Sequence, residues 1–251
     1  MATEAQRKEA LDLIRENIAR RGYHLYVVVG GSDPRFAYTI GLRDSLGAEL
    51  ILPRAAFYSI KEVGRIIDDV AAQLNGDRTR AGGRFEIGSL GSFSLREVHP
   101  TWAKALMLGA LDYYKADDVS ALQIIPDQIH WTTDVPNLGE QWSADTAPGW
   151  RWLHEPWDWP IPSKSIAITD LRALYGERVT EAMRWEEDEW ELFAGAGPDV
   201  TKDELRIVPI GTLIAFDKSL EAVLNLNVEE GLWRSDAEPE WHPWRKRDVQ
   251  E

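Results

Sequence analysis

Two indoles bracket four consecutive carboxylates in the C-terminal half of the sequence. The residues are Trp185, Glu186, Glu187, Asp188, Glu189 and Trp190. Crowded acids repel one another and stay ionised near neutral pH, so they do not form the unequal pair that acid–base catalysis needs. A tryptophan at the centre of an interface anchors binding, and the charges around it speed association with an oppositely charged partner. The segment therefore predicts a surface that binds a basic protein. The alternative is that both indoles lie in the core and the acids only solubilise the domain.

A second group of polar residues lies on two apolar segments of the N-terminal half. Tyr38 and Thr39 are in one predicted strand, and Gln123, Asp127 and His130 lie on or just after another. If these strands pair, the five side chains could line a pocket for a small ligand or a metal ion. In a small sheet, residues of these types also commonly satisfy backbone groups. The group predicts, as an alternative function, a small-ligand-dependent or metal-dependent enzyme.

The sequence lacks the patterns that would identify a catalytic centre. It contains no cysteine and no Gly-x-Ser-x-Gly segment, and no two of its five histidines have the i, i+4 spacing of a helical metal site. Gly30-Gly31 follows an apolar strand without the further Gly and Lys of a phosphate-binding loop, so it predicts a hairpin turn. We therefore expect no catalytic residue, no metal and no cofactor, and we favour a protein that is not an enzyme.

The charge of the chain is concentrated in its C-terminal half. Residues 1–134 carry 16 Lys and Arg against 18 Asp and Glu, whereas residues 135–251 carry 12 against 24. Ten of the 12 tryptophans lie from Trp142 onward. Nucleic-acid binding needs clustered cations, and the one compact basic run, Arg245-Lys246-Arg247, is expected to be a solvated tail. The composition indicates a basic protein partner and no nucleic acid, and it leaves the oligomeric state open.

The apolar runs of the sequence are short. The longest fall far below the roughly 18 residues of a membrane-spanning helix, and the first residues do not form a signal-peptide pattern. We expect a cytoplasmic protein without a membrane partner.

The periodicity predicts an α+β fold of two small mixed domains, each a mainly antiparallel sheet with packed helices. The expected domains are residues 1–134, a Trp- and Pro-rich strap over 135–162, and an acidic domain over 163–251. We expect helices over 3–21, 53–74 and 101–114, a helix capped by Asp217, and strands over 23–29, 36–42, 49–52, 84–87, 93–98, 119–125, 166–169, 179–185, 190–193 and 206–210.

Three segments of the N-terminal half carry a family resemblance. They are 36–42 (FAYTIGL), 48–51 (AELI) and 121–127 (ALQIIPD). In order and spacing they resemble a bacterial family, domain-of-unknown-function family 4262, over roughly residues 11–131. Ala48 stands where that family usually has Pro, and 128–131 (QIHW) replaces its usual Gly and Pro-Trp. The resemblance implies a fold and no established activity.

The C-terminal half resembles small bacterial domains predicted to be immunity proteins of polymorphic toxins. The shared pattern is a Trp-bearing strand, 189–195 (EWELFAG), then 208–211 (VPIG) and the helix start 217–220 (DKSL). This resemblance implies a cytoplasmic immunity protein that neutralises a basic toxin through its acidic domain. That is our leading expectation, with the N-terminal ligand pocket and a structural or oligomerisation module as alternatives.

Overall fold

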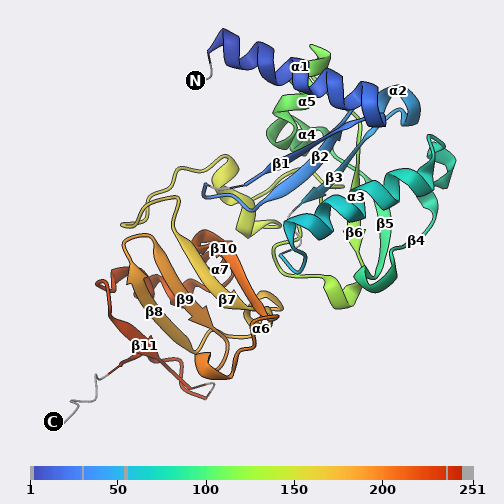
Figure 1. The fold of residues 1–251 in the computed structure, drawn as a ribbon. Coiled ribbons are helices and arrows are strands. Elements are labelled where there is room, and N and C mark those ends of the chain that lie inside the picture. The colour runs from blue at the N-terminus through green and yellow to red at the C-terminus, as the bar shows by residue number, and fades with distance from the viewer. Residues whose placement is uncertain (1–2, 30, 54–55, 236, 245–251) are drawn as a thin grey trace. The chain divides into compact units, whose positions relative to one another are not determined.

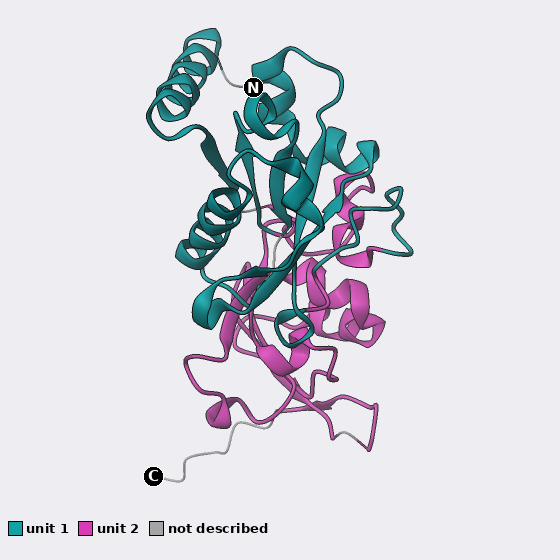
Figure 2. Cartoon of the chain, turned by 90° about the vertical axis from the view of Figure 1, so that its right-hand side faces the viewer, with its two compact units in different colours: residues 1–29, 35–131, 135–146 teal, residues 30–34, 132–134, 147–251 magenta. Residues whose placement is uncertain are grey.

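The computed structural model describes residues 3–29, 31–53, 56–235 and 237–244. The basic run Arg245-Lys246-Arg247 lies outside these residues. The chain divides into two compact units, and Figure 2 colours them separately. Unit 1 comprises residues 1–29, 35–131 and 135–146, and unit 2 comprises 30–34, 132–134 and 147–251. Each unit contains a six-stranded mixed sheet with packed helices, which confirms the α+β fold class.

Unit 1 is built on the strand order β1-β2-β3-β6-β5-β4 (Figure 1). Its neighbouring strands pair antiparallel, except that β3 and β6 are parallel. Its elements are α1 (Glu4–Arg21), β1 (His24–Val28), β2 (Phe36–Ile40), α2 (Arg43–Leu46), β3 (Glu49–Pro53), α3 (Ile60–Leu74), η1 (Arg78–Gly82), β4 (Phe85–Glu86), η2 (Gly88–Leu90), β5 (Ser92–Glu97), α4 (Pro100–Leu106), α5 (Leu108–Tyr114), β6 (Ala121–Pro126) and η3 (Gln128–His130).

The main core of unit 1 lies between α3 and one face of this sheet. Helix α3 carries the apolar residues Val63, Ile67 and Val70 at helical spacing, and all three are buried. They pack with alternate strand residues such as Leu50 and Leu122, which are register partners on the parallel pair β3–β6. Removing this apolar surface from water is the main driving force for the fold of the unit.

Two of the helices expected in unit 1 differ from the prediction. Pro53 was expected in the first turn of a helix, but it ends β3 opposite Phe36. Helix α3 begins only at Ile60, because Ser59 and Glu62 form a reciprocal capping box there. The single helix expected over 101–114 is two helices that meet at Met107, and α4 starts from His99 with Pro100 in its first turn.

Unit 2 has the strand order β10-β7-β9-β8-β11-β12. Strands β7 and β9 are parallel, and the other neighbouring pairs of the sheet are antiparallel. Its elements are η4 (Pro148–Leu153), β7 (Ile166–Asp170), α6 (Leu171–Leu174), β8 (Glu181–Glu186), β9 (Glu189–Phe193), η5 (Gly197–Asp199), β10 (Leu205–Pro209), α7 (Ile210–Phe216), η6 (Lys218–Asn225), β11 (Gly231–Trp233) and β12 (His242–Pro243).

The two faces of the unit 2 sheet differ in burial. Alternate residues such as Trp190, Leu192 and Val208 are fully buried on the face that carries α7. Most residues of the opposite parity stay partly or largely exposed: Ile207 is 69% exposed, whereas Phe193 is buried. We call this second surface the open face. Its members are Ile168, Glu181, Met183, Trp185, Glu189, Glu191 and Ile207.

The end of the chain is more regular than the sequence suggested. No strand was expected after residue 210, yet Gly231–Trp233 and His242–Pro243 form β11 and β12, and the helix expected after Asp217 is the 3₁₀ helix η6. In the part of the chain that the structure describes, no helix combines the length and apolar character needed to cross a bilayer.

Candidate functional site

The two tryptophans that bracket the acidic turn lie on opposite faces of the unit 2 sheet. Trp185 is 44% exposed, whereas Trp190 is fully buried. Successive residues of a strand point to opposite faces of the sheet, and Trp190 is the first residue of β9 that points toward the buried face. An irregularity between Arg184 and Glu186 shifts the register of β8 next to Trp185. Trp190 is therefore a core residue, and Trp185 is the indole of this pair that reaches the surface.

The acids of the turn remain at the surface. Glu186 and Glu187 are exposed, and Asp188 and Glu189 are partly exposed. Asp188 forms an ion pair with Lys164 Nζ at 2.5 Å, and this hydrogen bond lowers the pKa of the Asp188 carboxyl below its ordinary value. The carboxylates of the other three form no hydrogen bond or ion pair within the described residues, although the charge of Glu187 helps the Asp188 hydrogen bond to raise the pKa of the Lys164 ammonium.

The shape of this acidic turn is set by Arg184. Its guanidinium donates to the carbonyl oxygens of Glu186 at 3.2 Å and Glu187 at 2.7 Å. It also donates to the carbonyl of Leu226 and lies over the Trp190 ring, 4.5 Å from the ring centroid. One buried indole and one cation therefore fix the backbone that displays the acids. The sequence pattern did not single out Arg184.

The open face contains a pocket of about 410 Å³ beside Trp185. Most of its lining is apolar, and Glu181 and Glu191 supply its two carboxylates. The residues that line it are Glu181, Ala182, Met183, Trp185, Glu191, Phe193, Gly197, Pro198, Val200, Leu205 and Trp244. A hydrophobic hollow with acidic groups suits a ligand that combines an apolar stem with positive charge. The sequence analysis found Trp185 but missed this pocket, because its walls come from five separate segments of the chain.

In unit 1, three of the residues expected in a ligand pocket are internal and engaged by the protein. Tyr38, Thr39 and Gln123 are almost completely buried. The Tyr38 hydroxyl accepts the Gly109 N–H at 3.1 Å. The Gln123 side-chain amide donates to the Pro136 carbonyl at 2.7 Å, and its oxygen accepts the Leu138 N–H at 2.9 Å. Gln123 thus holds the chain after η3 against β6, and these contacts are structural.

Thr39 contacts a buried carboxylate, that of Glu49, which the sequence analysis did not identify. Glu49 is completely buried. It accepts hydrogen bonds from the Thr39 hydroxyl at 2.6 Å and the Tyr114 hydroxyl at 2.5 Å, and its oxygens also accept the backbone N–H groups of residues 41–43. Burial raises the pKa of Glu49, and these donors oppose that shift. A lone acid inside the apolar run 48–52 (AELIL) was the signal that could have revealed it.

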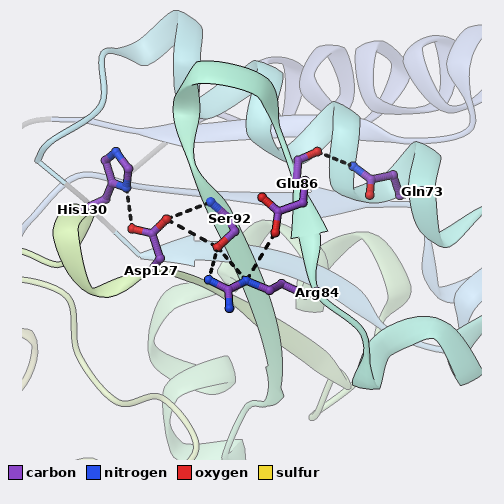
Figure 3. A network of polar contacts seen from close by, with 6 residues as sticks. All are labelled: Gln73, Arg84, Glu86, Ser92, Asp127 and His130. Atoms are coloured by element: carbon purple, nitrogen blue, oxygen red, sulfur yellow. Dashed lines mark hydrogen bonds and ion pairs between the residues drawn. The ribbon is translucent and has the colours of Figure 1, made fainter.

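The other two residues of the expected pocket, Asp127 and His130, do lie together (Figure 3). Asp127 Oδ1 is 2.5 Å from His130 Nδ1, and Asp127 Oδ2 accepts the Ser92 N–H at 2.9 Å. The Ser92 hydroxyl in turn accepts hydrogen bonds from the Arg84 guanidinium at 2.8 and 2.5 Å. The His130 ring packs edge-on against Phe57, with centroids 4.6 Å apart. A carboxylate that orients an imidazole is an arrangement found in ligand and proton-transfer sites.

The Asp127–His130 pair also joins η3 to the loop before β5. Burial by itself would raise the pKa of Asp127, but the hydrogen bonds from the Ser92 N–H and from His130 outweigh it and hold the pKa below the ordinary value of 3.8. Gly91 makes the approach possible: its φ is +94°, and a Cβ there would lie 2.6 Å from His130 Cε1. Within the described residues, no three His, Asp or Glu side chains gather as a metal site would require.

The family-like segments of the sequence correspond to these internal contacts. Thr39 and Glu49 bond to each other, Gln123 holds the segment after η3, and Asp127 caps the start of β5. A comparison with curated proteins finds no match, and neither does a comparison with solved structures. Residues 17–130, which account for most of unit 1, match the family model described as "Domain of unknown function (DUF4262)".

Proposed function

We propose that this chain is a non-enzymatic protein that captures a basic protein on the open face of unit 2. The observation that carries the proposal is the exposed Trp185 beside an apolar pocket that also holds Glu181 and Glu191. An exposed indole next to a hollow can anchor an interface, and the excess of acids over bases in residues 135–251 attracts a cationic partner over a longer range.

In its most concrete form, the proposal is a cytoplasmic immunity protein that neutralises a basic toxin. A toxin that cleaves nucleic acid has a cationic cleft built for phosphate, and an acidic protein face complements such a cleft. The segments that resemble immunity domains support this form. Glu189–Phe193 is strand β9 at the centre of the unit 2 sheet, and Asp217 caps η6 by accepting the Ser219 N–H at 2.9 Å.

The test uses the product of the gene adjacent to this one, provided that product is basic and toxic to cells. Co-expression with this chain is expected to restore growth, and the two proteins are expected to elute as one complex at about 0.15 M salt, where the screening length is about 8 Å. Replacing Glu186, Glu187 and Glu189 with Lys is expected to slow association at least tenfold and to abolish protection.

The matched control places the same charge change on unit 1. Glu4, Glu9 and Glu16 are exposed on α1, and their replacement by Lys changes net charge equally without altering the open face. This control is expected to retain protection. If the unit 2 charge reversal leaves both association rate and protection unchanged, the proposed function is wrong.

A second candidate function remains for unit 1, because the His130 Nε2 has no hydrogen-bond partner within the described residues while Nδ1 is held by Asp127. This arrangement supports a small-ligand site at the Asp127–His130 pair.

Purified protein that carries a metal or a coloured cofactor, which is lost in His130→Gln, would favour this second candidate function. Protein that purifies colourless and metal-free would count against it. The third alternative is a purely structural or oligomerisation module. Full burial of both Trp185 and Trp190 within one chain would favour it, and Trp185 is 44% exposed.

A further inference from the structure

The pocket on the open face has a composition that selects among cations. Trp185 and Trp244 both line it and are both about half exposed. Met183 is the register partner of Gly231, and Trp244 packs directly over that glycine. A Cβ at Gly231 would lie 2.5 Å from Trp244 Cδ1 and 2.9 Å from the Met183 sulfur. The glycine therefore leaves the space that the second indole fills.

The carboxylates of the pocket are not neutralised by the described part of the chain. Glu191 is partly buried on β9 opposite Met183, and its carboxylate makes no hydrogen bond or ion pair with any described residue. Glu181 uses one oxygen to accept the Gly197 N–H at 2.7 Å. A carboxylate beside apolar walls gains more from a cation than one in open water, because the local dielectric is lower.

Among protein cations, the guanidinium group fits these walls best. It is planar and weakly hydrated, it stacks on indoles, and it can donate two parallel hydrogen bonds to one carboxylate. The chain uses the same pairing internally. The Arg184 guanidinium lies over Trp190, and that of Arg234 lies 4.1 Å from the Trp241 ring centroid while pairing with Asp217 at 2.9 Å. A lysine ammonium would have to give up more water to enter the same hollow.

We infer that this pocket binds an arginine side chain of the basic partner, with its guanidinium against Trp185 and Trp244 and paired with Glu191. The inference rests on the proposed function and names the group that the partner inserts. Charge complementarity over residues 135–251 brings the partner to the face, and the pocket then discriminates among its cations.

The test titrates full-length protein with a blocked Gly-Arg-Gly tripeptide at low salt while the indole N–H signals are followed by NMR. The signals of Trp185 and Trp244 are expected to shift saturably, and those of the buried Trp102 and Trp150 are not. The lysine tripeptide is expected to bind about tenfold more weakly, and the citrulline tripeptide, which lacks the charge, is expected not to saturate.

Two variants and a matched control locate the site. Glu191→Gln is expected to weaken binding of the arginine tripeptide at least tenfold, and Trp185→Ala is expected to abolish it. Glu187→Gln removes the same charge outside the pocket and is expected to leave the affinity unchanged. An unaltered amide spectrum away from the site shows that each variant is folded. Equal binding of the arginine and citrulline peptides, or no saturable shift at all, would overturn the inference.

Two further arms identify the source of the arginine. Arg245 and Arg247 follow Trp244 in the sequence, so the titration is repeated with Arg245→Gln/Arg247→Gln. If the tripeptide binds only to that variant, the pocket holds the chain's own arginine and the assignment to a partner is wrong. If the basic partner binds Glu191→Gln as tightly as wild type but Trp185→Ala more weakly, the inference fails while the proposed function stands. If the tripeptide binds but charge reversal at Glu186, Glu187 and Glu189 leaves the partner unaffected, the proposed function fails instead.

Discussion

The guanidinium of Arg184 lies 4.5 Å from the ring centroid of the buried Trp190 and, from that position, donates to the carbonyls of the acidic turn. The pairing links the core of unit 2 to its open face. A side chain that is itself inaccessible thereby fixes the backbone next to Trp185.

Truncating Trp190 is expected to destabilise the fold much more than truncating Trp185. Trp190→Ala removes a fully buried indole and is expected to lower the free energy of unfolding by about 3–5 kcal/mol. Trp185→Ala removes a half-exposed one and is expected to cost less than about 1 kcal/mol. Urea unfolding followed by circular dichroism measures both. Similar losses in the two variants would contradict the assignment of the two indoles to opposite faces.

Removing the Arg184 guanidinium is expected to loosen the acidic turn. Arg184→Met keeps an apolar stem over Trp190 but leaves the carbonyls of Glu186, Glu187 and Leu226 without this donor. Amide hydrogen exchange is expected to accelerate at residues 186–189 and to remain unchanged in β7. Arg206→Met, on the edge strand β10, is the comparison variant. Unchanged exchange in the turn would show that Arg184 does not set its conformation.

The buried carboxylate of unit 1 is expected to depend on Tyr114. Tyr114→Phe deletes the hydroxyl that donates to Glu49 at 2.5 Å, and it is expected to lower the free energy of unfolding by about 1.5–3 kcal/mol. Tyr113→Phe is the matched control, because the Tyr113 hydroxyl has no hydrogen bond within the described residues. The control is expected to stay within about 0.5 kcal/mol of wild type. Equal effects in chemical denaturation would rule out a special role for the Glu49 contacts.

Gly91 is expected to be intolerant of any side chain. Gly91→Ala forces a positive φ on alanine and drives its Cβ against Asp127 and His130, so it is expected to cost at least about 2 kcal/mol. Gly82→Ala provides the comparison, since a Cβ there meets nothing within 4 Å and its φ is not positive. Thermal unfolding of the two variants distinguishes them. A tolerant Gly91→Ala would mean that the Asp127–His130 pair can move away from this loop.

The low pKa of Asp127 predicts a specific pH dependence. Because its pKa is lower in the folded chain than in the unfolded chain, the carboxylate contributes stability that is fully present above about pH 4 and is lost as pH falls through the folded value. The stability difference between wild type and Asp127→Asn is therefore expected to shrink as pH is lowered from 5 toward 2. Urea unfolding at several pH values measures this difference. A difference that stays constant over that range would exclude the proposed linkage.

The sequence determined the fold class and most of the strands, because these follow from local pattern. Alternation of apolar and polar residues along single strands, and the 3.6-residue recurrence of Val63, Ile67 and Val70, do not depend on distant partners. The family-like segments were also visible, although their role was not: only pairing of β2 with β3 shows that Thr39 and Glu49 bond to each other.

The tertiary structure decided which side chains are available for binding. The chain order places Trp185 and Trp190 on either side of one acidic turn, but burial depends on which sheet face α7 covers and on an irregularity in β8, and neither is a local property. The pocket, too, could not be predicted from local sequence patterns. Trp185, Glu191 and Trp244 are far apart in sequence, and only the pairing of β8 with β9 and β11 brings their segments to one surface.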